Sequence, residues 1–213
     1  MLKTPILKEI AAYPRDYANG SLELASMVLE AWAAGLPIEE LRPTVVNWIA
    51  SIRGKPGIYR RSPDNLEQSS HDEWLGLAAL DHIYKLGIAA EILDQGRTLG
   101  LWITGKPHSS ILWGKLGVDG EWLTGWRPEY LAIMKMADGR QINGFEKWAL
   151  ELNLSLSTTW NLLRVRLLLL THMGYKNLTP YYDKLGTKYK GRYGNHRVYL
   201  KLWEMNGSGY GTN

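Results

Sequence analysis

Three carboxylates lie close together in the sequence, and their chemistry would suit general acid–base catalysis. Asp72 and Glu73 are adjacent, and Asp81 follows on the same stretch of helical periodicity. Glycoside hydrolases use a pair of carboxylates, one of which has its pKa raised by burial. A structural interpretation is equally open, because Ser70-His71-Asp72-Glu73 has the pattern of a helix capping box. Residues 72–81 therefore define one hypothesis, a glycoside hydrolase-like enzyme.

Motifs for cofactors, metals and nucleophiles are incomplete. Gly100-Leu-Trp-Ile-Thr-Gly105-Lys106 follows the phosphate-binding loop up to its lysine, but Pro107 stands where Ser or Thr would hold magnesium. His71-Asp72 has no upstream histidine to complete a metal site, because His71 is the first histidine of the chain. The sequence contains no cysteine and no Gly-x-Ser-x-Gly elbow. We therefore expect no cofactor, no metal and no catalytic residue of these classes.

The strongest charge pattern is a basic segment near the C-terminus. Residues 176–201 hold seven Lys or Arg and one Asp, a formal charge of +6 that leaves −2 for the rest of the chain. Tyrosines are interleaved with the basic residues, as in surfaces that pair lysines with phosphates and stack aromatic rings on bases. A shorter basic cluster lies in the Gly- and Pro-containing loop before the carboxylates. The candidate partner-binding residues are Lys184, Lys188, Lys190, Arg192, Arg197, Tyr189, Tyr193, Arg60 and Arg61.

Three interpretations of this basic segment stay open at the level of sequence. It could be a solvated face that keeps the protein in solution. It could dock on an acidic protein partner, since complementary charge guides association. It could also bind nucleic acid, in which case affinity would fall steeply with added salt.

The aromatic composition is unusual, with ten Trp and twelve Tyr against a single Phe. Trp and Tyr combine a large apolar body with a polar group, which suits half-buried surfaces such as subunit interfaces. A Trp-rich core is the alternative, because Trp is highly buried on average. Hydrophobic residues make up 45% and charged residues 22% of the chain, which is typical of globular proteins.

The chain has no pattern of a secretory leader at its N-terminus. Its most apolar segment, 160–173, is too short to span a bilayer and contains Arg164 and Arg166. With no cysteine, it cannot form a disulfide. These features predict a protein that folds in the cytoplasm and has no membrane partner.

Helical periodicity dominates the chain and predicts an all-α fold, a single domain over residues 1–213. Ser21 is the predicted N-cap of the first helix, and Gly35 and Gly174 are predicted helix stops. The Gly-rich stretch 99–126 interrupts the pattern as an irregular insertion, where Asp119-Gly120 favours a β-hairpin turn and where a subdivision of the domain would fall. The predicted helices cover residues 22–34, 38–52, 70–84, a shorter one between Gly87 and Gly96, 128–137, 145–152, 158–173, 180–185 and 197–205. Of these, 158–173 is apolar on nearly every side and is expected to be central.

Two stretches resemble uncharacterised proteins of tailed bacteriophages. The first is Tyr59-Arg60-Arg61-Ser62-Pro63-Asp64, followed by Ser69-Ser70-His71-Asp72-Glu73 and the apolar helix start Trp74-Leu75-Gly76-Leu77. The second comprises the apolar helix 162–170, a Tyr- and Lys-rich segment and the turn Asn195-His196-Arg197. The resemblance implies a phage-encoded, virion-associated protein and supplies no catalytic residues. The Gly-rich stretch 99–126 departs from this pattern.

The function that these observations favour is that of a non-enzymatic structural protein in bacteriophage virion assembly. Such a protein would be oligomeric, would contact copies of itself or other virion proteins through aromatic and basic surfaces, and would move from the host cytoplasm into the virion. The first alternative is a nucleic-acid-binding accessory protein that uses residues 176–201. The second is the glycoside hydrolase-like enzyme with carboxylates near residues 72–81.

Overall fold

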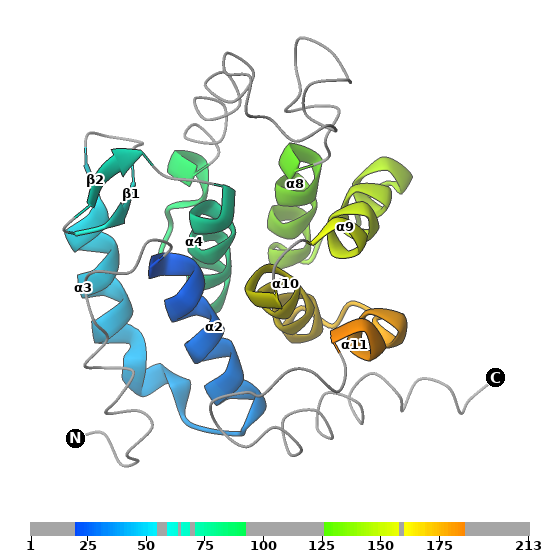
Figure 1. Cartoon of the computed structure of the whole chain (residues 1–213), viewed down its shortest axis with the longest axis horizontal. Coiled ribbons are helices and arrows are strands. Elements are labelled where there is room, and N and C mark those ends of the chain that lie inside the picture. The colour runs from blue at the N-terminus through cyan, green and yellow to red at the C-terminus, as the bar shows by residue number, and fades with distance from the viewer. Residues whose placement is uncertain are drawn as a thin grey trace, which may run out of the picture.

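The structure is a computed structural model that describes residues 20–54, 59–63, 65–68, 71–92, 126–157 and 160–185. The described residues are helical except for one short β-hairpin and the connecting turns, so the predicted all-α class is confirmed (Figure 1). Residues 99–125 of the predicted insertion, with its β-hairpin, and the helix predicted for 197–205 lie outside the described residues, whereas Trp126, the last residue of that predicted stretch, begins a helix.

Helix α2 (Gly20–Ala33) and helix α4 (His71–Tyr84) pack against each other at the centre of the fold. Gly76 permits the close approach, because a Cβ at this position would overlap the backbone of Ser21 and Leu22. Both carboxylate oxygens of Glu73 accept from the Ser21 N–H, at 2.8 and 3.0 Å. An α4 carboxylate therefore satisfies an N–H group at the start of α2, where the helix dipole favours negative charge.

The predicted role of Ser21 as N-cap is wrong, since α2 begins one residue earlier, at Gly20. The Ser21 hydroxyl instead accepts from the indole N–H of Trp48, at 2.9 Å. The Ser21 hydroxyl, which the sequence predicts to cap its own helix, is thus hydrogen-bonded to a tryptophan 27 residues further along the chain. The predicted stop at Gly35 is confirmed, because this glycine has φ of 76°, a left-handed conformation that glycine adopts without strain.

A 3-10 turn, η1 (Ile38–Leu41), leads directly into helix α3 (Arg42–Ile52). The chain then forms an antiparallel hairpin of β1 (Arg60–Ser62) and β2 (Asn65–Gln68), with Arg60 opposite Gln68. The Gly- and Pro-containing sequence predicts a loop here, so the hairpin is a correction. Strand β1 has only three residues, and two of them are adjacent arginines. It therefore lacks the alternation of apolar and polar residues from which a strand is recognised in a sequence.

Helix α8 (Trp126–Ala137) is followed by helix α9 (Gly144–Leu156). Asn143 caps α9: its side chain accepts from the Glu146 N–H, and the Glu146 carboxylate accepts from the Asn143 N–H, both at 2.8 Å. This reciprocal capping box fixes where α9 begins. Figure 1 shows α9 on the far side of α8 from α2 and α3.

Helix α10 (Trp160–His172) is buried along almost its whole described length, as its apolar sequence predicts. It packs against α2, α4, α9 and the last described helix, α11 (Thr179–Leu185). Gly174, with φ of 76°, ends it as predicted. One continuous apolar cluster includes residues of all the described helices. Within the described residues, no helix is both long enough and apolar enough to cross a bilayer.

Two arginines of α10 are buried in this core, and each meets a buried carboxylate. Arg164 contacts Glu30 of α2 at 3.0 Å and Glu23 at 3.6 Å. Arg166 binds Glu129 of α8 through two N–H groups, at 2.6 and 3.2 Å. Arg164 and Arg166 thus hold α10 between α2 and α8 through their ion pairs.

Candidate functional site

The predicted basic and tyrosine-rich site falls mostly outside the described residues. Arg60 and Arg61 are in β1, where the side chain of Arg60 is half-buried, and Lys184 is in α11. The role of residues 176–201 in binding a partner therefore stays a prediction. The predicted binding residues outside the described part are Lys188, Tyr189, Lys190, Arg192, Tyr193 and Arg197.

The three candidate catalytic carboxylates have different surroundings. Glu73 is fully buried against the start of α2, where no substrate could reach it. Asp72 is partly exposed, and Asp81 is partly exposed on the opposite end of α4. One oxygen of Asp81 accepts from the Ile88 N–H at 3.1 Å, which fixes the turn after α4. The structure therefore assigns Glu73 a structural role and places only Asp81 beside a cavity.

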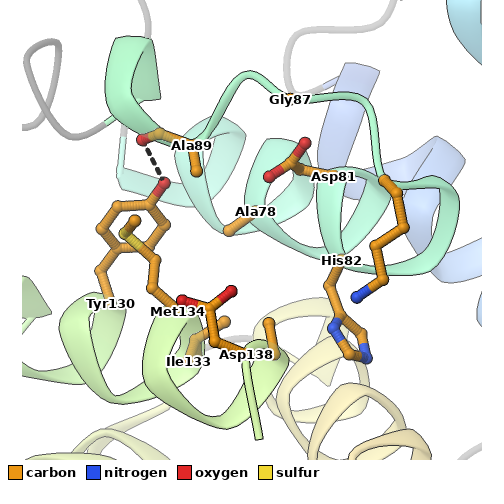
Figure 2. Close-up of a pocket in the computed structure, with 11 residues that line it drawn as sticks. Ala78, Asp81, His82, Gly87, Ala89, Tyr130, Ile133, Met134 and Asp138 are labelled. Atoms are coloured by element: carbon orange, nitrogen blue, oxygen red, sulfur yellow. Dashed lines mark hydrogen bonds between the residues drawn. The ribbon is translucent and has the colours of Figure 1, made fainter. Parts of the chain in front are cut away.

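A pocket of about 250 Å³ lies between α4 and α8, towards the C-terminal ends of both helices (Figure 2). The two helices run in the same direction, since Trp74 and Tyr130 of their first halves are in contact, with ring centroids 4.0 Å apart. Small residues on the facing surfaces leave the space open. The residues that line it are Ala78, Asp81, His82, Lys85, Gly87, Ala89, Tyr130, Ile133, Met134, Ala137 and Asp138.

The polar groups of the pocket come from opposite walls. Figure 2 shows Asp81 on the wall formed by α4 and Asp138 at the end of α8. Asp138 also pairs with Arg140 at 2.8 Å on the exposed side. Tyr130 closes one end, and its hydroxyl donates to the Ala89 carbonyl at 2.9 Å. Burial is the main cause that raises the pKa of Tyr130, and the negative charge of Asp81 adds to it, so this tyrosine stays protonated.

His82 lines the pocket away from Tyr130 and is paired with His172, which lies outside the lining. Nε2 of His82 lies 3.1 Å from Nδ1 of His172, which joins α4 to α10. The ring of Trp32 packs edge-on against His172, with centroids 4.7 Å apart. Burial, followed by the positive potential of His172 and Lys85, lowers the pKa of His82 from 6.5 to about 4. Both rings are therefore neutral near pH 7, because the pKa of His172 is lowered as well, by burial and by Lys85.

Helix α9 carries an exposed apolar surface that the sequence analysis did not identify. Phe145 and Trp148 are 51% and 45% exposed, and their rings stack with centroids 5.4 Å apart. Leu152 is half-buried, and Leu156 is 41% exposed. Spacings of three and four residues place these four side chains on one side of the helix. We call Phe145, Trp148, Leu152 and Leu156 the α9 stripe.

The rest of α9 shows that this stripe is separate from the core. Glu146, Ala149, Leu150, Asn153 and Leu154 are buried, and they occupy a different side of the helix. The helix thus has two apolar sides, one covered by the protein and one in contact with solvent. Its periodicity alone could not reveal which of the two would be covered.

These groups form one polar pocket and one exposed aromatic surface. In the part of the chain that the structure describes, no cluster of three or more His, Asp or Glu is arranged to hold a metal ion. The pocket offers two carboxylates, one ammonium and an apolar floor, and α9 offers a stacked aromatic surface. No protein-family model matches the chain, and no curated protein or solved structure has significant similarity to it.

Proposed function

We propose that this protein is a non-enzymatic structural protein of a bacteriophage particle, and that it associates with a second copy of itself through the α9 stripe. The observation that carries the docking role is the stacked and exposed pair Phe145 and Trp148. Aromatic residues of this kind are enriched at the centres of protein interfaces. The phage context rests on the sequence resemblance of residues 59–77 and 162–197.

The charges beside the stripe favour a second copy as the occupant. Lys147 and Glu151 lie one turn apart on the exposed side of α9 beyond Trp148, with a separation of 4.0 Å between their charged atoms. In a two-fold, antiparallel contact between two α9 helices, each Lys147 meets the Glu151 of the partner. This arrangement is self-complementary in charge, as an interface between identical surfaces requires.

The size of the stripe indicates that this contact is weak by itself. A fully buried aromatic side chain removes about 150–250 Å² from water, so four partly exposed apolar residues supply roughly 300–400 Å². A stable dimer needs about 800 Å² from each partner. We therefore expect reversible self-association of the isolated protein, strengthened in a particle by further contacts such as those of the basic segment.

Sedimentation equilibrium of the full chain over a range of concentrations tests the docking role. Phe145→Ser with Trp148→Ser should abolish self-association. Val46→Ser is the matched control, because Val46 is 46% exposed on α3 and away from α9. A wild-type protein that stays monomeric up to about 1 mM, the concentration that corresponds to about 4 kcal/mol of binding free energy, would contradict self-association.

Charge exchange tests the two-fold geometry. Lys147→Glu alone should weaken the association, because it places a carboxylate against Glu151 of the partner. The double exchange Lys147→Glu with Glu151→Lys should restore it.

Absence of the protein from purified particles would overturn the virion role. A monomer that carries nucleic acid and releases it in high salt would instead favour the nucleic-acid alternative.

A further inference from the structure

We propose that the pocket between α4 and α8 binds a primary ammonium group carried on a short alkyl chain. This site is separate from the α9 stripe and does not depend on the proposed self-association. The argument rests on the space in the pocket, on its apolar floor and on the position of its charges.

The space is built into the sequence of the two helices. The residues of α4 and α8 that face each other include Ala78 and Ala137, and Gly87 and Ala89 follow in the next turn. Side chains of this size cannot fill the space between two helices, whose axes are usually 8–10 Å apart. A pocket of 250 Å³ is large enough for several waters or for one small organic molecule.

The floor of the pocket is apolar and suits an alkyl chain. Ile133 and Met134 of α8 line it together with Ala78 of α4. Tyr130 adds its ring, and its hydroxyl is already engaged with the Ala89 carbonyl. An alkyl chain against these residues would displace water from apolar surface, which is favourable.

The charged side chains that line the pocket are Asp81, Lys85 and Asp138. Asp81 lies on α4 and Asp138 on the opposite wall (Figure 2). Asp81 accepts a hydrogen bond from the Ile88 N–H with one oxygen only, so the carboxylate can accept further hydrogen bonds. A cationic group is therefore favoured beside the free oxygen of the Asp81 carboxylate.

The backbone strengthens this preference. Both α4 and α8 end beside the pocket, at Tyr84 and Ala137. The C-terminal end of a helix carries partial negative charge and attracts cations. Asp138 follows α8 on the wall opposite Asp81. Two carboxylates and two helix C-termini thus face the pocket against one ammonium group, that of Lys85, and the neutral His82 adds no further positive charge.

NMR titration of the ¹⁵N-labelled full chain with n-pentylamine tests the site. We expect shifts of the backbone amides in residues 81–89 and 133–138, with a Kd of about 1 mM, which suits a ligand with so few atoms. The same titration with n-pentanol should give binding at least about tenfold weaker, because the charge-assisted hydrogen bond is lost. Equal binding of the alcohol, or no shift with the amine, would overturn the proposal.

Four single-residue variants test whether the amine binds in this pocket. Asp81→Asn keeps an acceptor for the Ile88 N–H but removes the charge, and it should weaken amine binding about tenfold. Asp72→Asn, at the other end of the same helix, should leave it unchanged. Ala137→Leu fills the space and should abolish binding. Trp148→Ser should bind the amine normally, which keeps this result independent of the α9 stripe. Unchanged binding in Asp81→Asn and Ala137→Leu would refute the site.

The alkylammonium could belong to a free amine or to a lysine side chain of another protein. Titration with N-acetyl-lysine methylamide separates the two sources. Binding at least as tight as that of n-pentylamine supports a lysine side chain as the occupant. Binding of n-pentylamine alone supports a free amine, because the backbone of the lysine derivative is then excluded. Failure of both compounds to bind overturns the proposal.

Discussion

The buried pair of Arg166 and Glu129 allows a quantitative test of how α10 is held in the core. Their side chains are 3% and 1% exposed, and two N–H groups of the guanidinium meet the carboxylate. A third contact links Arg166 to the Ser157 hydroxyl at 2.9 Å. The perturbation is Glu129→Leu, which removes the charge partner and leaves the guanidinium buried.

The expected loss follows from the burial. Removal of one partner from a buried ion pair costs about 3–5 kcal/mol, because the remaining charge is neither hydrated nor paired. Replacement of both partners by apolar residues is often near neutral. Glu129→Leu with Arg166→Met should therefore cost about 1–2 kcal/mol, most of it from the lost contact with Ser157. The double variant is thus expected to be more stable than the single variant.

Urea denaturation followed by circular dichroism measures these differences. With a slope of about 2 kcal/mol per M, a loss of 4 kcal/mol lowers the midpoint by about 2 M. Glu39→Leu is the control, because the pair of Glu39 with Arg42 is exposed, and we expect a change below about 0.5 kcal/mol. If the double variant loses the sum of the two single losses, the two residues are not coupled and the reasoning is refuted.

Three further predictions concern helix contacts. Gly76→Ala should destabilise the fold by several kcal/mol in thermal unfolding, whereas Gly144→Ala, with open space around it, should change stability by less than about 1 kcal/mol. Glu73→Gln should cost about 1–3 kcal/mol in urea, because the buried start of α2 loses its charged acceptor; an unchanged midpoint would contradict the capping role. The free energy of unfolding should fall as the pH decreases from 6.5 to about 4, because His82 takes up a proton more readily in the unfolded state than in the folded state. The lowered pKa of His82 corresponds to about 3 kcal/mol, which solvent screening at this half-buried site reduces to about 2 kcal/mol. His82→Phe should remove the part of this pH dependence that comes from His82 and leave the part that comes from His172, whose pKa is also lowered by burial.

The sequence predicted those features of the fold that depend on neighbours along the chain. Helical spacing located the described helices, and the glycine stops were confirmed at Gly35 and Gly174 because each needs only a local left-handed residue. The N-cap at Ser21 was wrong because the group that binds its N–H comes from Glu73, and no local pattern identifies a partner 52 residues away. The hairpin at 60–68 was missed for lack of an alternating pattern.

In the candidate site, too, the sequence identified residue types but not the contacts that depend on tertiary structure. Asp81 was identified from its residue type, but its pocket depends on α4 lying beside α8, and this neighbour relation is a property of the tertiary structure. The α9 stripe was present in the sequence as spacing from Phe145 to Leu156. It was not recognised because α9 is apolar on two sides, and only packing against α8 and α10 decides which side is covered.

The contact between Glu73 and Ser21 also has a consequence for the order of folding. Helix α2 is completed at its N-terminus only when α4 is in place, and Gly76 allows the two backbones to meet only in the correct register. The chain between them must first close a loop of about fifty residues, at an entropic cost that no local contact offsets. We therefore expect the α2–α4 crossing to belong to the folding nucleus, so that substitutions there slow folding, while those on α9 mainly accelerate unfolding.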